Sequence, residues 1–575
     1  MATLDKLQSL PEEILLHILS FLPYEEIVKL QSVSKFFLRI CRDGNFWRNR
    51  CLSGYVLREQ VRDHPNRIVW SMPENSSSLS SKERGREHTR LTANWDPTFP
   101  NEKVNWYDEY IQRNAPIAVS WFQLPYTRND PTRIPIDVRG SALYQVSSTS
   151  RDVFAVSPLD DGSVCIWDVK GNRGRQGSII ARSMSGLLFA DGPATHASRR
   201  SKRIDSGVVE CVSIDNQRNR AFFAVQNHLV EVDLETMATV RDQAYEWSIN
   251  TLSTIQPTVP LTVGTTLGLH LHDHRSPSYS LPLYAPLAQP SPLSILHLEQ
   301  AGHQDKVSDD IFVAGRFSNI LHYDRRMFQS IQSSIHSGAK LCAMTSLPYR
   351  SSTNAELQGD LQLSEEQVRA KNEPGRTLVA CGEYNTKGSL EMYGVSAETC
   401  GEGNPRAFWK SAMKNRQTAS QSKLLSVINH GTRIVYSDGQ GYLKWVERDG
   451  VTEVRRHKIG LSERVTHRSL FGSMPGSDEI ALKILSTKPG QDGGEAINDD
   501  DLLLWTGERL GVVSFSSKPG FFADEFEDDT RTPEKIAAEE EQELYGEKMR
   551  LALERHARDV HFVRNLGAGG IRTGT

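Results

Sequence analysis

Three histidines alternate with leucines in one short segment, and they are the residues whose spacing could most directly support chemistry. His270, His272 and His274 are two residues apart, so in a strand their imidazoles project from one face, where they could hold a metal ion. Leu269 and Leu271 directly precede His270 and His272 and are expected to point inward. We therefore interpret the histidines as packing or rim residues and keep a metal site as the alternative.

Motifs of common catalytic sites are missing from the sequence. It contains no G-x-x-x-x-G-K-[ST] phosphate loop, no G-x-S-x-G elbow and no H-E-x-x-H zinc helix. Asp160, Asp161, Asp168 and Asp273 occupy turn positions, where an Asp side chain bonds to nearby backbone. We therefore expect a chain that is not an enzyme and that needs no cofactor or metal.

The charge balance and the cysteines limit the classes of partner and compartment. The chain has 67 basic and 71 acidic residues, a net charge of −4, so no overall field favours nucleic acid or an anionic membrane. Its seven cysteines include no C-x-x-C pair, which indicates reduced thiols. No segment has the ~18–20 consecutive apolar residues of a membrane span, and the N-terminus has no apolar leader. We expect a protein of the cytoplasm, the nucleus or both, with no membrane insertion.

The elements that must position these residues are short strands. From about residue 117 the apolar period changes from helical to strand-like, and short apolar runs alternate with turns. A turn followed by alternating apolar residues and a closing polar residue occurs seven times, at 162–168, 228–233, 268–273, 318–324, 388–393, 441–446 and 511–515.

Each of these segments is preceded by another strand-like run. The preceding runs are 153–157, 221–225, 261–263, 311–314, 377–381, 432–436 and 501–505. A hairpin repeated at roughly 40–50 residues or more is typical of propeller blades, because each small sheet must pack on its neighbours to bury its faces. The sequence predicts a seven-bladed β-propeller over 117–518, with two stacked β-sandwiches as the alternative.

The repeats are similar to WD repeats, although in degenerate form. Trp167-Asp168 is the one Trp-Asp pair at the repeat position, and the Gly-His that should open each repeat is not recognisable. The resemblance therefore implies the propeller but not the polar network that usually joins the strands of a WD blade.

A predicted helix near the N-terminus carries an apolar face. Pro11 suits the first position of a helix, and Glu12 and Glu13 place negative charge at the positive end of the helix dipole. Pro23 is expected to end the helix, and its apolar residues recur at helical spacing: Ile14, Leu15, Ile18, Leu19 and Leu22.

More short helices are expected at 25–30, at 36–41 after a cap at Ser32 or Ser34, and at 45–52. The resulting bundle is close to the smallest size that folds alone, and its apolar surface is suited to completion by a partner.

This helical bundle resembles the F-box. The matching residues are Leu10-Pro11-x-Glu13-Ile14-x-x-x-Ile18-x-x-x-Leu22, then Val33-Ser34-Lys35 and the closing Trp47-Arg48. The resemblance covers residues 7 to 52, and it implies binding to a Skp-type adaptor and, through it, to a cullin-based ubiquitin ligase. The alternative is a helical hairpin that packs on its own chain.

The same resemblance assigns residues to the adaptor interface. The residues implied to face the adaptor are Leu10, Pro11, Ile14, Leu15 and Ile18. Those implied to divide between adaptor contact and the bundle core are Leu22, Leu30, Val33 and Trp47. No residue is assigned to a target protein. Recognition of a phosphorylated target would require arginines that converge on one propeller face, and the candidates are Arg182, Arg316, Arg325 and Arg326.

The fold class is therefore a multidomain α plus all-β chain. We predict an F-box helical domain at 1–55, a linker and connector at 56–116 with a helix at 104–114, the propeller at 117–518, and an acidic segment with a C-terminal helix at 519–575. Polar loops are expected at 192–205, 351–375 and 488–501. The basic run 199–203 is either a solvated loop or a nuclear-localisation or phosphate-binding patch.

The resemblance implies a substrate-recognition subunit of a Skp-cullin-F-box ubiquitin ligase, in which the propeller holds an unknown target protein. A scaffold that binds the adaptor outside a ligase, and assembles a trafficking or nuclear complex, is the alternative. An enzyme would require a propeller hydrolase or a metal at His270 to His274.

Overall fold

The structure is a computed structural model of the 575-residue chain. It describes residues 10–52, 104–127, 134–146, 152–189, 212–256, 258–273, 275, 283–299, 307–348, 375–396, 409–460, 479–487, 501–515, 544–545, 548–549 and 552. The chain divides into two compact units, residues 1–41 with 519–575, and residues 42–518, and each is described by itself.

The N-terminal unit contains three short helices, α2 (Glu12–Ser20), α3 (Tyr24–Leu30) and α4 (Lys35–Ile40). Pro11 is the N-cap of α2, one position earlier than predicted, and α2 ends at Ser20 because Pro23 is already the N-cap of α3. The predicted cap at Ser34 is present, where its Oγ accepts from the Phe37 N–H at 3.3 Å. Leu15, Leu19, Ile27, Phe37, Leu38 and Ile40 form the buried side of these helices.

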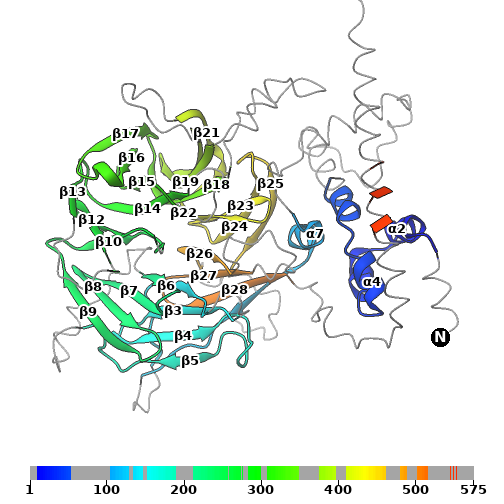
Figure 1. Ribbon diagram of the computed structural model, residues 1–575, viewed down its shortest axis with the longest axis horizontal. Helices are drawn as coiled ribbons and strands as arrows, with labels where there is room; N and C mark the ends of the chain where they lie inside the picture. Colours follow the sequence, from blue (N-terminus) through cyan, green and yellow to red (C-terminus); the bar gives the residue numbers. More distant parts are fainter. Residues whose placement is uncertain are drawn as a thin grey trace, which may run out of the picture. The chain divides into compact units, whose positions relative to one another are not determined.

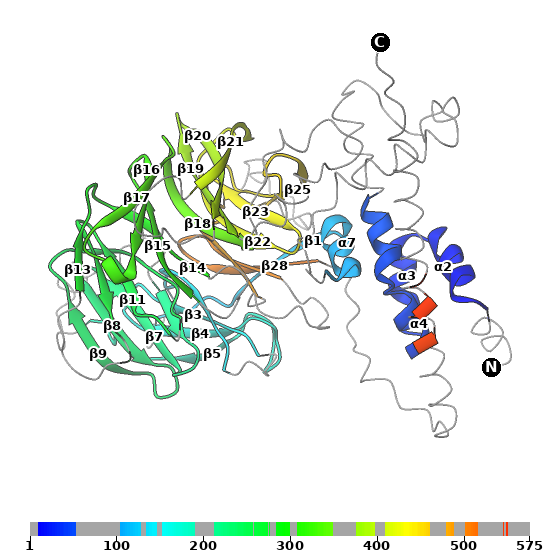
Figure 2. The same ribbon diagram turned by 45° about the horizontal axis from the view of Figure 1, so that its top comes forward.

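The larger unit begins with helical residues 44–52, capped by Asp43, whose carboxylate accepts from the Phe46 N–H at 2.8 Å. Helix α7 (Trp106–Asn114) follows, close to the helix expected at 104–114, and is capped by Asn105. Figures 1 and 2 show α7 beside the blade formed by β22 to β25.

Seven four-stranded antiparallel sheets follow one another in a ring (Figure 1). Blades 1 to 3 are β2 (Ala142–Tyr144), β3 (Phe154–Pro158), β4 (Val164–Asp168) and β5 (Ile179–Arg182); β6 (Val212–Asp215), β7 (Arg220–Val225), β8 (His228–Asp233) and β9 (Ala238–Ala244); β10 (Ile249–Leu252), β11 (Leu261–Thr265), β12 (Gly268–His272) and β13 (Leu283–Pro286).

Blades 4 to 7 complete the ring. They are β14 (Pro292–Glu299), β15 (Val307–Gly315), β16 (Asn319–Asp324) and β17 (Ile331–His336); β18 (Lys340–Pro348), β19 (Gly375–Tyr384), β20 (Lys387–Ser396) and β21 (Trp409–Ser420); β22 (Leu424–His430), β23 (Arg433–Asp438), β24 (Tyr442–Glu447) and β25 (Glu453–Lys458); β26 (Lys483–Ser486), β27 (Leu502–Trp505), β28 (Leu510–Phe515) and β1 (Ile117–Trp121).

The last blade closes the ring with two distant parts of the chain. Strand β1 pairs with β28 from Ile117 opposite Phe515 to Trp121 opposite Gly511. The first strands of successive blades contact one another, as β14 does β18 and β18 does β22, so they line the ring axis. Side chains of neighbouring blades fill the space between them, and one cluster joins Val156, Phe222 and Leu252 of blades 1, 2 and 3.

The prediction of seven blades is confirmed, and it excludes two stacked sandwiches. The seven predicted repeats are the third strands of the blades, and the runs before them are the second strands. Every residue of β3 and β4 is buried, whereas the outermost strand β9 is mostly exposed. Burial on both faces explains why the middle strands had the clearest apolar pattern.

Some predicted features fall on residues that the structure does not describe. The loop at 192–205 with its basic run, and most of the loops at 351–375 and 488–501, lie outside the described residues. Of the predicted C-terminal helix, residues 544–545, 548–549 and 552 are described, and they are helical. Within the described part of the chain, no helix has the length and hydrophobicity to cross a bilayer.

Candidate interaction surface and connector helix

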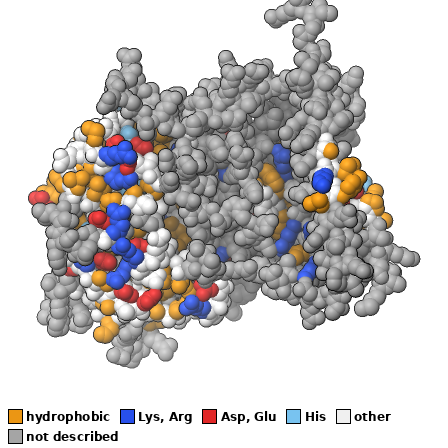
Figure 3. Space-filling model, in the orientation of Figure 1, with side chains coloured by type: hydrophobic (Ala, Val, Ile, Leu, Met, Phe, Trp, Pro, Cys, Tyr) orange, Lys and Arg blue, Asp and Glu red, His pale blue; other side chains and the backbone are white. Residues whose placement is uncertain are grey.

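One side of α2 and its flanks carries uncovered apolar side chains. Leu10, Ile14, Ile18 and Phe21 follow one another at steps of four, four and three residues, so they lie on the same side of the helix. All four are exposed, with Ile14 at 49% and Phe21 at 76%. Figure 3 shows hydrophobic side chains gathered over the N-terminal helices. We call these four residues the α2 face.

The other predicted adaptor-facing residues divide between surface and interior. Pro11 and Val33 are exposed, and Leu22 and Leu30 are half-buried. Leu15 is only 4% exposed, which corrects the expectation that it faces a partner: like Leu19 one turn later, it lies on the buried side of α2.

The sequence-based assignment missed Phe21. Its ring lies edge-on to the ring of His17, with 5.0 Å between the centroids, and is otherwise the most exposed of the large apolar side chains on the α2 face. The signal was present in the spacing, because residue 21 continues the series 10, 14 and 18. The F-box pattern has its apolar position at Leu22, so the pattern predicts that residue in place of Phe21.

Trp47 forms part of the core of the larger unit. Its side chain is completely buried, and its ring centroid lies 5.3 Å from that of Tyr107 and 4.8 Å from that of Tyr110, both on α7. The Arg48 guanidinium lies 5.8 Å from the Trp106 ring centroid. The helical residues 44–52 are therefore packed against α7 through aromatic contacts.

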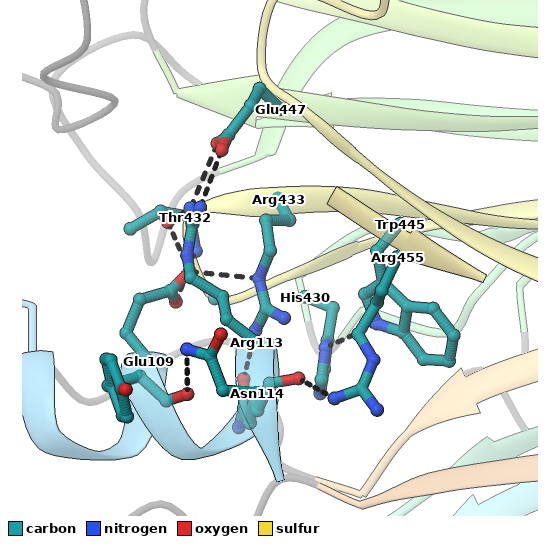
Figure 4. A network of polar contacts seen from close by, with 12 residues as sticks. Glu109, Arg113, Asn114, His430, Thr432, Arg433, Trp445, Glu447 and Arg455 are labelled. Carbon is teal, nitrogen blue, oxygen red and sulfur yellow. Dashed lines mark hydrogen bonds and ion pairs between the residues drawn. The ribbon is translucent and has the colours of Figure 1, made fainter. Parts of the chain in front are cut away.

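Helix α7 is in turn bound to blade 6 by buried ion pairs (Figure 4). Arg113 donates to both carboxylate oxygens of Glu447, at 2.5 and 2.9 Å, and to Glu109 at 2.7 Å. Arg433 forms a second ion pair with Glu109 at 2.9 Å. These four side chains, which we call the α7 ion network, contain two positive and two negative charges and are almost fully buried.

Thr432 completes the α7 ion network with hydrogen bonds from two uncharged donors. Its backbone N–H and its hydroxyl donate to the two carboxylate oxygens of Glu109, at 3.1 and 2.6 Å. Burial alone would raise the pKa of Glu109, but Arg433, Arg113 and the two bonds from Thr432 outweigh it and hold that pKa far below its usual range. Glu109 therefore stays ionised.

The C-terminal end of α7 is also held by blade 6. Arg455 of β25 donates to the carbonyl oxygens of Gln112 and Ala115 at 2.6 and 2.8 Å, which satisfies groups that have no partner within the helix. Its guanidinium lies 5.8 Å from the ring centroid of Trp445, whose indole N–H donates to His430 Nδ1 at 3.2 Å (Figure 4).

These contacts define which side of the ring α7 occupies. They lie at the turn between β22 and β23 and at the end of β24, where the first and third strands of a blade end. We call this side the lower face. The opposite side, which carries the turns between second and third strands and the links between blades, is the upper face.

The histidines considered for metal binding lie in β12 and contact aromatic side chains. His270 lies with its ring centroid 4.8 Å from that of Tyr245 and 5.0 Å from that of Tyr284. His272 Nδ1 is 3.4 Å from the Tyr245 hydroxyl, and His274 is outside the described residues. Both described imidazoles are buried, as are Leu269 and Leu271, because each face of β12 packs against a neighbouring blade. No metal-binding group of three side chains occurs among the described residues.

Blade 4 contains a Ser-His-Asp arrangement whose residues lie on three different strands, so no local sequence motif predicts it. His322 Nδ1 is 3.0 Å from Ser333 Oγ, and its Nε2 is 2.9 Å from Asp310 Oδ1. The order of groups is that of an acyl-transfer triad. However, the His322 ring is buried and stacked on Phe312 at 4.9 Å, and its partners lie on the two strands beside its own. We interpret it as a structural hydrogen-bond network that links β15, β16 and β17.

The four candidate arginines do not converge on one place. Arg182 is paired with Asp161 at 2.8 Å in blade 1, and Arg326 is paired with Asp309 at 2.6 Å in blade 4. Arg325 also pairs with Asp309 and lies on the lower face, whereas Arg316 lies in the β15–β16 turn on the upper face. A phosphate site built from these four arginines is therefore excluded.

The comparison with known families agrees with the helical arrangement. Residues 7–53 match the family model for the F-box-like domain. A search of curated proteins found no match for this chain.

Proposed function

From the premise that this chain is an F-box protein with a seven-bladed β-propeller, we propose that it is the substrate-recognition subunit of a Skp-cullin-F-box ubiquitin ligase. In this role the F-box at 1–55 binds a Skp-type adaptor and, through it, a cullin. The propeller at 117–518 holds a target protein, and the chain has no catalytic step of its own.

The observation that carries the proposal is the uncovered α2 face within the family-matched segment. Leu10, Ile14, Ile18 and Phe21 are exposed in the chain alone, although large apolar side chains are normally buried. Full burial of such a side chain is worth about 1.5–3 kcal/mol, and covering the exposed part of each of these four gives a share of that value. The four shares together support association after the cost of ordering the partners. Val33 adds a fifth exposed apolar side chain in the same segment.

The proposed mechanism is positional. A target held by the propeller would lie near the ubiquitin-carrying enzyme of the ligase, so its effective concentration at that enzyme would rise. The α7 ion network supports this role because it binds the connector to blade 6, and Trp47 binds the last helix of the matched segment to the connector. A mobile connector would lower the effective concentration.

We further propose that the protein acts in the cytoplasm, the nucleus or both. The described cysteines, Cys41, Cys51, Cys165, Cys342 and Cys381, are thiols, as expected of a reducing compartment.

The test is a pull-down of purified adaptor by the full chain. Ile14→Glu should abolish binding because it places a charge in the centre of the α2 face. The matched control is Val240→Glu on β9, because Val240 is also an aliphatic residue with 49% exposure. The control should bind normally. Equal binding by both variants would contradict the proposal.

The scaffold alternative predicts the same adaptor contact and differs only in what accompanies it. Co-purification of a cullin with the wild type, and its loss with Ile14→Glu, favours the ligase. The scaffold is favoured if the adaptor co-purifies without a cullin. It is also favoured if proteins that bind the chain do not accumulate in cells from which the chain has been deleted.

A further inference from the structure

The upper face carries unpaired positive charge where blades 4 and 5 meet. Lys340 begins β18, and Lys387 begins β20, and both side chains are exposed. Arg316, in the β15–β16 turn of the same face, is also exposed. Among the described residues, none of these three has an acidic group within ion-pair distance. Glu383 lies opposite Lys340 in the β18–β19 ladder, but no ion pair joins the two side chains.

Three side chains from different strands converge in the same region. Gly338, in the link from β17 to β18, has a φ of +85°, and a methyl group added to it would lie 3.7 Å from His336 Nε2 and 3.8 Å from Arg416 Nη2. The same point is 3.8 Å from Tyr384 Cε2. The side chains of His336, Tyr384 and Arg416 therefore form a polar, partly cationic surface around Gly338, which has no side chain of its own.

Arg416 is held in place by a buried carboxylate. Its Nη2 lies 2.6 Å from Glu391 Oε1, and its guanidinium stacks 3.9 Å from the Tyr384 ring centroid. Glu391 is completely buried and also accepts from Ser337 and Ser389 at 2.6 and 2.8 Å. The position of Arg416 is therefore fixed before a ligand binds, so binding would cost little conformational entropy of this side chain.

Lys414 adds a further cation beside Arg416. Its ammonium donates to the carbonyl oxygens of His336 and Ser337, at 3.0 and 2.9 Å, and the side chain is exposed. We call Lys340, Lys387, Lys414, Arg416 and His336 the blade 4–5 patch. Its exposed cations outnumber its acidic residues, although the whole chain has a net charge of −4.

We propose that the blade 4–5 patch binds a carboxylate-rich peptide segment of a partner protein, with glutamate and aspartate side chains paired to its lysines and to Arg416. Charge complementarity favours an anion, and the flat Tyr384 ring under the Arg416 guanidinium suits an extended chain. A nucleic acid is disfavoured because it requires a longer basic track than this patch offers, on a protein of the opposite net charge. The identification of this partner as the ligase target rests on the proposed function.

The probe is a fluorescein-labelled peptide of ten glutamates, titrated with the full chain at low salt and followed by fluorescence anisotropy. A peptide of ten glutamines is the uncharged control. The test variant is Lys340→Glu with Lys387→Glu, since both side chains are exposed and, among the described residues, neither forms a side-chain hydrogen bond or an ion pair. The matched control is Arg326→Glu with Arg456→Glu, whose side chains are 80% and 64% exposed and lie outside the patch.

The proposal is supported if the glutamate peptide binds the wild type, and if its dissociation constant rises about tenfold in the test variant and less than twofold in the control variant. The proposal is overturned by no binding at low salt, by equal weakening in both variants, or by tighter binding of a single-stranded oligodeoxynucleotide. Binding of a phosphoserine peptide without binding of the glutamate peptide also overturns it. The titration contains no adaptor, so its failure leaves the proposed function standing, and failure of the adaptor pull-down leaves the patch standing.

Discussion

Arg113 of α7 and Glu447 at the end of β24 are 334 residues apart in the chain and form a two-pronged ion pair with N···O distances of 2.5 and 2.9 Å (Figure 4). The Arg113 side chain is completely buried, and that of Glu447 nearly so. A buried charge is costly without its partner. Any other position of α7 on blade 6 would separate the two charges, so the ion pair favours this one position.

Removal of the Arg113 charge should therefore destabilise the larger unit strongly. In Arg113→Met, Glu447 loses its partner in the ion pair and Glu109 keeps only Arg433, so the free energy of unfolding should fall by about 3–5 kcal/mol. Urea denaturation measures this change. Arg456→Met on the exposed side of β25 is the control and should change the value by less than about 0.5 kcal/mol. Similar values for the two variants would mean that the network contributes little.

The two neighbouring residues Ile14 and Leu15 should respond differently to substitution. Ile14 is 49% exposed, so Ile14→Glu should remove adaptor binding with little change in the melting temperature of the chain. Leu15 is 4% exposed, so Leu15→Ala should cost about 2–5 kcal/mol of bundle stability and weaken binding only through loss of fold.

Circular dichroism of each variant, measured beside the adaptor pull-down, separates the two effects. A stable Leu15→Ala variant that fails to bind would show that Leu15 touches the adaptor after all.

The sequence was sufficient to predict the number of blades but not their complete strands. In blade 1, β3 and β4 pack on both faces, and their uninterrupted apolar character was visible. Strand β9 has the sequence Ala-Thr-Val-Arg-Asp-Gln-Ala and is mostly exposed, so nothing in its composition distinguishes it from a polar loop. Strand β1 begins at residue 117, where the strand-like pattern was predicted to start, but its pairing with β28 was hidden because it joins segments almost 400 residues apart.

For the candidate site, the local spacing of residues predicted the exposed face of α2, but contacts between distant parts of the chain could not be predicted. The series Leu10, Ile14 and Ile18 predicted the exposed side of α2, since helical periodicity is a local property. Which of Ile14 and Leu15 faces outward depends on where the other helices pack. The α7 ion network was not predicted, although Glu109 and Arg113 at a spacing of four gave a weak signal.

The stability of the propeller should decrease with acid because of His270. Burial lowers the pKa of His270 to about 4, from an ordinary value of 6.5. The unfolded chain therefore binds a proton at this residue between pH 6.5 and 4 when the folded chain does not, so stability is lost as the pH falls through that window. The loss amounts to at most about 3 kcal/mol.

Urea midpoints measured from pH 8 to pH 4 test this dependence. His270→Gln cannot titrate, so its curve should be flatter than that of the wild type below pH 6.5 and parallel to it above pH 7. Parallel curves over the whole range would contradict the assignment.

The Ser333, His322 and Asp310 arrangement should stabilise blade 4 without making it a hydrolase. Its histidine ring is buried against Phe312 and bridges β15 and β17, so His322→Leu should leave Asp310 and Ser333 without that partner and cost about 1–3 kcal/mol. A serine-directed fluorophosphonate probe should not label the native chain, because an unactivated hydroxyl is a weak nucleophile. Labelling that disappears in both Ser333→Ala and His322→Gln, with the fold retained, would instead identify an active nucleophile.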